Sequence, residues 1–355
     1  MSRIRDIANI LSANTDMATD AEVTSSIASH AAAADPHTVY LKESEFNAAG
    51  KNIVVNGGFD VWQRGTSVAY GTVAGRGADC WIIVRSGWAG GATMSRQTGT
   101  AESPYCARVQ RDSGNTSTSY IAITNSLESI NCVKFAGKQI TFSFYARKGA
   151  NYSEASSLIS YSLNSGTGTD QNITTTGLTG QTALVDTVAT ITTSWQRFSW
   201  TGTVPSNSNQ LAVGFAWTPV GTAGAADYFE ITNVQIELGT AATPFTRVGG
   251  NPAGEYALCQ RYYQVIGDNI YELINGGYMQ SGNSAYASWT LPVEMRTTPT
   301  GTKVGNWAVF NCNQPTLQAS WPGGFSMQSV CNTTGHYYFH SNTTYYITML
   351  SLIHI

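Results

Sequence analysis

The sequence contains few charged residues. Asp, Glu, Lys and Arg make up 12% of its 355 residues, which is about half of the roughly 25% usual for soluble domains. The formal net charge is −3 and no run of Lys or Arg occurs, which argues against nucleic acid or an anionic lipid surface as the main partner. Because 42% of the residues are hydrophobic, the chain can build real cores rather than remain disordered.

Long apolar runs are also missing. No stretch approaches the roughly 18 consecutive apolar residues of a membrane-spanning helix, so we expect no membrane insertion. Residues 1–6 contain neither an apolar signal core nor a cleavage site. We therefore expect the product to stay in the cytosol of the cell that makes it.

Motifs for common enzyme chemistry are not found either. There is no G-x-S-x-G elbow, P-loop or dinucleotide fingerprint, so we expect no cofactor. The six cysteines are scattered without a C-x-x-C pair, and we expect six buried thiols rather than disulfides or a zinc site.

A polysaccharide depolymerase would need two carboxylates about 5 to 9.5 Å apart across a sugar. The spacing of the acidic residues brings no two of them together. We expect them to cap turns or to pair with Arg64 or Arg247, and we expect the protein not to be an enzyme. The carboxylates considered are Asp60, Asp79, Asp227, Glu230, Glu237 and Glu294.

Two helical patterns occur in the N-terminal part of the chain, and no helical run of length appears between residues 52 and 250. Residues 2–12 form a short amphipathic pattern, and a second helix should begin at Thr19, where Thr-Asp-Ala-Glu has the form of a capping box. This second helix is too short to be stable alone in water, and we expect it to bundle with copies of itself. Its apolar positions follow the 4-3-4 spacing of a coiled coil; they are Val23, Ile27, His30 and Ala34.

From Asn52 onward the pattern repeats every two residues. Residues 139–146 alternate between apolar and polar side chains, which indicates a strand with one buried face. In residues 229–238 the alternation slips at Thr232-Asn233, which predicts a β-bulge. Turn residues separate such strands, so we expect an antiparallel sandwich.

The C-terminal part has its own strand pattern. Residues 249–254 have the composition of a linker, and residues 255–264 have a helical or turn-like character. Residues 287–295 then alternate, with Pro292 indicating an edge strand. Residues 345–355 are apolar on both phases, which indicates a strand buried on both faces. The expected fold is mainly β: a short α-helical leader, a jelly roll and a second β domain.

Several segments together resemble bacteriophage tail fibre and receptor-binding proteins with a jelly roll similar to carbohydrate-binding modules. The resemblance covers roughly residues 1–265, and Cys80 departs from it because an arginine is expected at that position. The segments that carry it are residues 2–9, 18–23, 34–41, 56–65, 78–81, 195–198, 230–239 and 258–263.

The resemblance implies a division into four parts. These are a helical virion-attachment leader (1–34), a neck (35–51), a jelly roll (52–250) and a β receptor-binding tip (251–355). It also implies a homotrimer in the virion tail, made in the host bacterial cytoplasm and joined to tail or baseplate proteins through its N-terminus. The tip would bind host surface polysaccharide or lipopolysaccharide without covalent chemistry. A structural fibre component without receptor contact is the alternative, and a depolymerase is a further one.

Flat aromatic rings suit the recognition of sugars, and some lie among Gly, Pro, Asn and Gln. We expect receptor contacts at Trp307, Trp321, Tyr337 and Tyr338, whose surroundings have the composition of exposed binding loops. The earlier tryptophans should belong to the sandwich core; they are Trp62, Trp81, Trp195 and Trp200. We expect no metal in one chain, although His336 and His340 share a strand face and could converge on a threefold axis.

Overall fold

The computed structural model of the chain describes residues 20–32, 51–70, 75–85, 91–269, 272–344 and 346–351. The chain divides into two compact units, residues 1–47 and 48–355. In the described part of the chain no helix is long and apolar enough to cross a membrane.

The first unit contributes one described helix, α2 (Asp20–Ala32). Its start confirms the helix predicted from Thr19, and Val23, Ile27 and His30 all lie exposed on it. Ala34, the expected helix at 2–12 and residues 35–50 of the expected neck fall outside the described residues.

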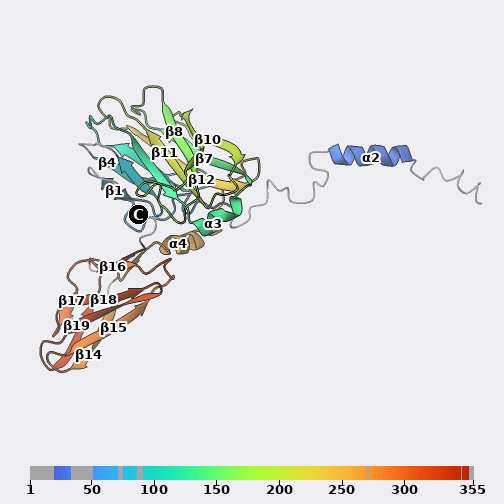
Figure 1. The fold of residues 1–355 in the computed structure, drawn as a ribbon. Coiled ribbons are helices and arrows are strands. Elements are labelled where there is room, and N and C mark those ends of the chain that lie inside the picture. The colour runs from blue at the N-terminus through green and yellow to red at the C-terminus, as the bar shows by residue number, and fades with distance from the viewer. Residues whose placement is uncertain are drawn as a thin grey trace, which may run out of the picture. The chain divides into compact units, whose positions relative to one another are not determined.

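The second unit begins with a sandwich of two six-stranded antiparallel sheets, as the sequence predicted (Figure 1). Sheet A has the order β1-β4-β5-β12-β7-β10, and sheet B has the order β2-β3-β6-β11-β8-β9. The strands of sheet A are β1 (Ser67–Tyr70), β4 (Ala92–Thr98), β5 (Tyr105–Arg111), β12 (Tyr228–Leu238), β7 (Gln139–Lys148) and β10 (Gln196–Thr203). Those of sheet B are β2 (Gly75–Arg76), β3 (Ile82–Arg85), β6 (Ile121–Ser126), β11 (Gln210–Trp217), β8 (Leu158–Gly166) and β9 (Thr182–Thr190).

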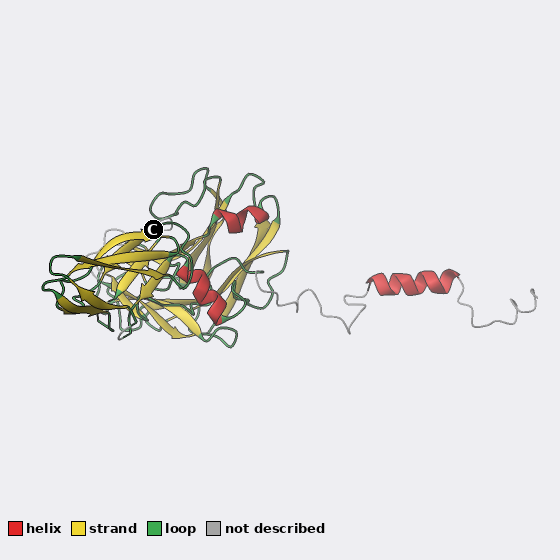
Figure 2. Cartoon of the chain, turned by 90° about the horizontal axis from the view of Figure 1, so that it is seen from below, coloured by secondary structure: helices red, strands yellow, loops and turns green. Residues whose placement is uncertain are grey.

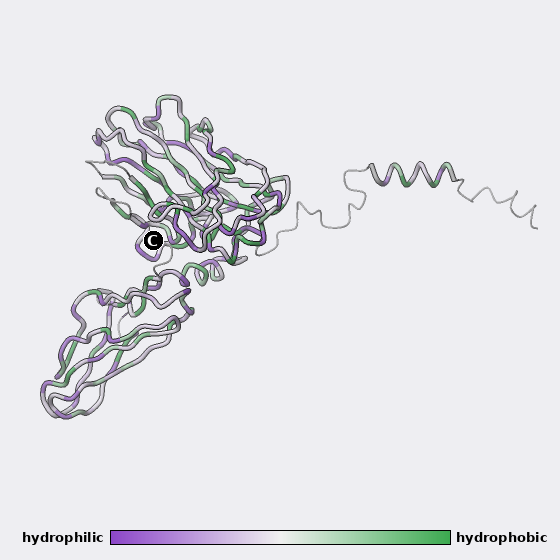
Figure 3. The backbone as a smooth tube through the Cα atoms, viewed as in Figure 1, coloured by the Kyte–Doolittle hydropathy of each residue, from purple (hydrophilic) through white to green (hydrophobic). Residues whose placement is uncertain are grey.

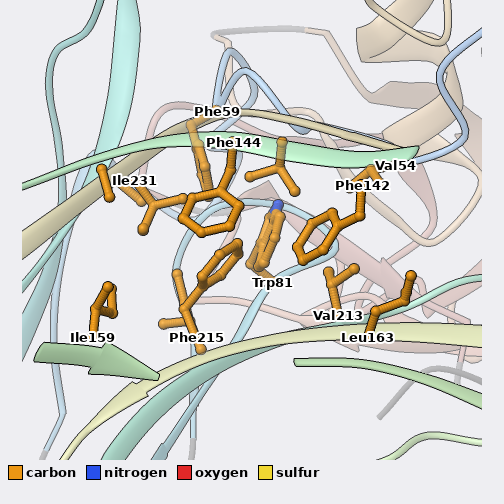
Figure 4. Packing of buried hydrophobic residues seen from close by; sticks show 14 of the residues in the cluster. Val54, Phe59, Trp81, Phe142, Phe144, Ile159, Leu163, Val213, Phe215 and Ile231 are labelled. Atoms are coloured by element: carbon orange, nitrogen blue, oxygen red, sulfur yellow. The ribbon is translucent and has the colours of Figure 1, made fainter. Parts of the chain in front are cut away.

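The sandwich core consists of aromatic and branched side chains from the inward phase of both sheets. Trp81 is fully buried, and its indole lies 4.9 Å from the ring of Phe59 and 6.2 Å from that of Phe215. Figure 4 shows these rings gathered with Phe142 and Phe144 between the strands. Trp62 is buried as well, and half-buried Trp200 packs against this core, which confirms the prediction for these three tryptophans. Trp195 is half-buried and lies beneath the guanidinium group of Arg147.

The outward-facing residues of sheet A are less exposed to solvent than the sequence alternation indicated. Thr141 and Ser143 alternate with buried rings as predicted, yet they are buried too. The segment after β12 lies over them, because the Thr141 hydroxyl donates to the Gly239 carbonyl (3.0 Å). The predicted bulge is confirmed, since the register of β12 against β7 shifts between Thr232 and Gln235.

Short helices connect the sheets. Helix α3 (Ser129–Cys132) and the 3-10 turn η2 (Val133–Phe135) lie between β6 and β7, and α4 (Pro252–Gln260) follows the sandwich. Residues 249–254 are therefore not simply a linker. Asn251 caps α4 by accepting a hydrogen bond from the Gly254 amide (3.0 Å), and proline suits the first turn.

The C-terminal region, residues 251–351, contains three small antiparallel sheets. Strands predominate here as in the sandwich (Figure 2), and the tube in Figure 3 alternates between hydrophobic and hydrophilic colours along them. The sheets are β13 (Tyr263–Ile266)-β21 (Ile347–Leu350)-β16 (Thr300–Lys303), β14 (Ile274–Met279)-β20 (Gly335–His340)-β17 (Ala308–Phe310), and β15 (Ser284–Thr290)-β19 (Gly324–Val330)-β18 (Thr316–Trp321).

Two expectations for this region need adjustment. The strand expected through residue 295 ends at Thr290, before Pro292, which cannot donate to a ladder. The expected terminal strand is described only as β21, the central strand of its sheet, while residues 345 and 352–355 lie outside the described part.

Candidate functional site

One sheet of the C-terminal region exposes a row of aromatic rings. Strand pairing places Tyr278 opposite His336 and Phe310 opposite Tyr338. Directly paired residues of antiparallel strands project from the same face, so these four side chains share one surface. With Ile274 they form what we name the aromatic face.

The rings on the aromatic face are open to solvent and ordered by contact with one another. The exposed fraction is 66% for Tyr278, 53% for Phe310 and 44% for Tyr338. The rings of Phe310 and Tyr338 stack 5.4 Å apart with an interplanar angle of 14°, and Tyr278 meets His336 edge-on at 5.4 Å. Large exposed apolar patches of this kind mark interaction sites in soluble proteins.

A glycine interrupts the row of side chains on the face. Gly276 pairs with Tyr338 on the neighbouring strand, and a Cβ added there would lie 2.9 Å from the Tyr337 carbonyl and 3.1 Å from the Tyr338 Cβ. Glycine inside a strand often marks a place where a ligand or another backbone approaches closely. Here the close neighbours are the backbone of β20 and the Cβ of Tyr338, and the Tyr338 ring itself stacks with Phe310 and with His340 (6.1 Å, 23°).

The aromatic face has no formal charge from acidic or strongly basic side chains. Strands β14, β17 and β20 contain no Asp, Glu, Lys or Arg. The basic side chains of these strands are His336 and His340, and His340 is buried with Nδ1 2.9 Å from the Ser341 carbonyl oxygen. Within the described residues, no group of three His, Cys, Asp or Glu side chains could hold a metal ion.

The four residues expected to contact a receptor lie in different places. Tyr338 belongs to the aromatic face. Trp321 is 39% exposed but lies on β18, in a different sheet, where its indole covers Gly324 at the β18–β19 turn. The expectation that Trp307 and Tyr337 lie in exposed loops is wrong, because they are 2% and 8% exposed.

Both misplaced residues have structural partners. The Trp307 ring packs 6.2 Å from Phe339, and its backbone amide donates to the Gln314 side chain. Tyr337 points to the opposite side of β20, where its hydroxyl donates to Asn275 Oδ1 at 3.1 Å. Burial raises the pKa of the Tyr337 hydroxyl.

Sequence reasoning did not find Tyr278, Phe310 or Ile274. Each lies on a short strand in which the alternation of apolar and polar residues cannot be recognised. In β14 Gly276 and Gly277 interrupt it, and β17 is only three residues long. The signal that remained in the sequence was the lack of Asp, Glu, Lys and Arg in both segments.

The acidic residues considered for catalysis are mostly bound to cations. Asp79 pairs with Arg64 and Asp60 pairs with Arg247, as expected. Burial nevertheless raises the pKa of Asp79 to about 6, because desolvation of the carboxylate outweighs the attraction of Arg64. Asp227 pairs with Arg111, Glu230 with Arg108 and Arg147, and Glu237 with Lys51, whereas Glu294 is exposed.

The six cysteines are all free, five of them buried and Cys80 half-buried, which is close to expectation. Cys80 has a φ of 67° and packs in a small cluster with Cys259. Burial and the neighbouring Cys80 raise the pKa of the Cys259 thiol. Burial keeps five of the six thiols from the accessible setting of a reactive cysteine.

No protein-family model matches the sequence, and no curated protein matches it. Solved structures resemble part of the chain at low sequence identity. One is described as "CBM4 structure and function"; it is 18% identical, with 52% of this chain and 99% of the other covered and a TM-score of 0.33. A xylan-binding domain from CBM 22 is 15% identical, with 46% and 90% covered and a TM-score of 0.28.

The enzymatically active domain of tailspike protein 4 from bacteriophage CBA120 is also similar. It is 10% identical and has a TM-score of 0.31, and the match covers 53% of this chain but 21% of the tailspike chain. At such identities and TM-scores these likenesses assign no site and no function to this chain.

Proposed function

We propose that this chain is a non-catalytic attachment protein that binds a cell-surface glycan through the aromatic face. The observation that carries the proposal is the exposed, uncharged set of rings of Tyr278, Phe310 and Tyr338 on one side of a rigid sheet. Ring faces pack against the apolar C–H faces of sugars, and burying them contributes both area and specific geometry.

Polar groups at the rim complement the rings. The hydroxyls of Tyr278 and Tyr338 and the imidazole of His336 can exchange hydrogen bonds with sugar hydroxyls. A strand-borne site of this kind is held more precisely than one on a loop.

The biological setting we propose is a bacteriophage tail fibre that recognises the host cell surface. It is supported by the sequence resemblance of the leader, the 34–41 segment and the jelly roll. Exposed Val23 and Ile27 on α2 suit self-association of a helix that is only 13 residues long. With several copies of the face on each particle, weak sugar binding would gain avidity by orders of magnitude.

The test removes two rings from the full-length chain. We expect Tyr278→Ala with Tyr338→Ala to weaken binding to an array of bacterial lipopolysaccharides and capsular polysaccharides by at least ~10-fold. The melting temperature should stay nearly constant, because both side chains are exposed. The matched control is Tyr286→Ala, which removes an equally exposed tyrosine from strand β15 of another sheet.

Unchanged glycan binding by the double variant would refute the aromatic face as the receptor site. Failure of the unaltered chain to bind any envelope glycan would instead favour a structural fibre component. Release of reducing sugar from a bound polysaccharide would contradict the non-catalytic mechanism.

A further inference from the structure

We propose that a second ligand site lies on the outer face of sheet A and takes the carboxylate groups of an acidic polysaccharide. The site consists of arginines laid over aromatic rings, and we name it the arginine face. Its residues are Arg108, Tyr145, Arg147, Trp195, Arg197, Tyr228 and Glu230.

The strand register gathers these side chains. Glu230 of β12 pairs with Arg108 of β5 on one side and with Arg147 of β7 on the other. In the next row Tyr145 of β7 pairs with Arg197 of β10. Paired residues project from one face of the sheet, so three guanidinium groups lie on the same surface.

Each guanidinium rests on a ring. The guanidinium carbon of Arg108 lies 3.8 Å from the ring centre of Tyr228. The same distance is 4.5 Å between Arg147 and Trp195, and 5.9 Å between Arg197 and Tyr145. Such contacts are attractive and hold the planar group flat. A cation fixed in this way loses little further freedom when it binds a ligand.

The charges on the arginine face do not cancel. Glu230 is fully buried and binds both Arg108, at 2.6 Å, and Arg147. Arg197 is exposed and donates to the Ser143 hydroxyl and to the Thr243 carbonyl oxygen, not to an acid in any described contact. Three positive groups therefore face Glu230, and Glu237, which projects from the same side of the sheet opposite Thr141, is bound by Lys51 instead. This positive excess lies in a chain whose net charge is −3.

The chemistry of the ligand follows from this arrangement. Guanidinium groups bind carboxylates through paired, charge-assisted hydrogen bonds that Lys does not reproduce. Half-buried Trp195, Tyr145 and Tyr228 provide apolar surface beside the cations for the body of a sugar. A polysaccharide with uronic acid units supplies both groups, whereas a neutral glycan leaves the positive charge unpaired.

The site is independent of the aromatic face. It uses different strands and a different ligand chemistry, so either proposal can fail without the other. The double variant Tyr278→Ala with Tyr338→Ala should leave binding at the arginine face unchanged.

The experiment titrates the full-length chain with an oligogalacturonate, a neutral dextran oligomer and a DNA duplex of matched charge. Arg197→Gln is the main variant because Arg197 is exposed and does not hold Glu230 in place. We expect it to weaken oligogalacturonate binding at least ~10-fold, and Arg197→Lys to recover part of the loss. Arg96→Gln is the matched control. Arg96 also lies over a tyrosine, 4.3 Å from the Tyr105 ring centre, but it projects from the same side of β4 as buried Met94 and so lies outside the arginine face.

Equal affinity of Arg197→Gln and the unaltered chain would overturn the proposal. So would DNA binding as tight as oligogalacturonate binding, because the face would then attract any polyanion. Preference for dextran over oligogalacturonate would overturn it as well.

Discussion

The aromatic face and the arginine face use similar side chains in opposite ways. On the aromatic face the rings of Tyr278, Phe310 and Tyr338 are open to solvent and touch one another. On the arginine face the rings of Tyr228 and Trp195 lie under guanidinium groups, so the charge meets the solvent first. The ligand class that a strand tyrosine suits therefore depends on its neighbours. A ring left uncovered suits a neutral ligand, and a ring covered by a guanidinium group suits an acidic one.

The C-terminal region also shows how burial separates two tryptophans with similar sequence surroundings. Trp307 packs against Phe339, whereas Trp321 covers a glycine at the end of a hairpin. Their indoles therefore have different roles, although Gly305 and Asn306 precede Trp307 and Pro322 and Gly323 follow Trp321. Substitution of each tryptophan tests whether the structure separates buried from exposed rings correctly in this region. The aromatic face was defined by the same separation.

The largest effect should come from Trp307→Ala. Removal of this buried indole leaves a cavity, and we expect a loss of ~3–5 kcal/mol in the free energy of unfolding. Trp321→Ala is the paired control and should cost less than ~1 kcal/mol, because its side chain is partly exposed. Urea unfolding of both variants gives the values, and similar losses would contradict the placement of the two indoles.

A smaller effect should follow Glu230→Gln. The change removes the buried carboxylate that Arg108 and Arg147 share, and we expect a loss of ~1–3 kcal/mol in the free energy of unfolding. The positive charge of the arginine face rises, so oligogalacturonate should bind more tightly. The control is Glu294→Gln, which alters an exposed carboxylate; equal stabilities of the two variants would show that Glu230 does not hold the arginines.

The smallest effect concerns salt at the aromatic face. Raising the ionic strength from ~0.01 M to ~0.1 M shortens the screening length from about 30 Å to about 10 Å. Binding of a neutral glycan should change less than ~2-fold, because the face has no Asp, Glu, Lys or Arg, whereas oligogalacturonate binding should fall several-fold. Titrations of both ligands at the two ionic strengths measure the contrast, and parallel losses would mean that one charged surface binds both.

Much of the fold was predictable because it follows local patterns. The alternation in residues 139–146, the bulge at Thr232 and the helix from Thr19 each rest on neighbouring residues, and the structure confirms them. The ion pairs of Arg64 and Arg247 were anticipated from the need of a carboxylate for a counter-charge.

The sites were less predictable because they depend on pairing between distant strands. Tyr338 meets Phe310 and Gly276 only after β14, β17 and β20 have assembled. Local composition placed Trp307 and Tyr337 in exposed loops, but both are buried, Trp307 against the Phe339 ring and Tyr337 with its hydroxyl bound to the Asn275 side chain. Arg108 and Arg147 likewise come together only through β12.

The most direct test of sugar binding is an NMR titration of the full-length chain with labelled aromatic rings. A neutral oligosaccharide drawn from a polysaccharide that the chain binds is added, and the ring signals are followed. We predict shifts at Tyr278, Phe310 and Tyr338, with the signals of Tyr286 and Trp307 unmoved. Shifts confined to residues outside the aromatic face would contradict the account.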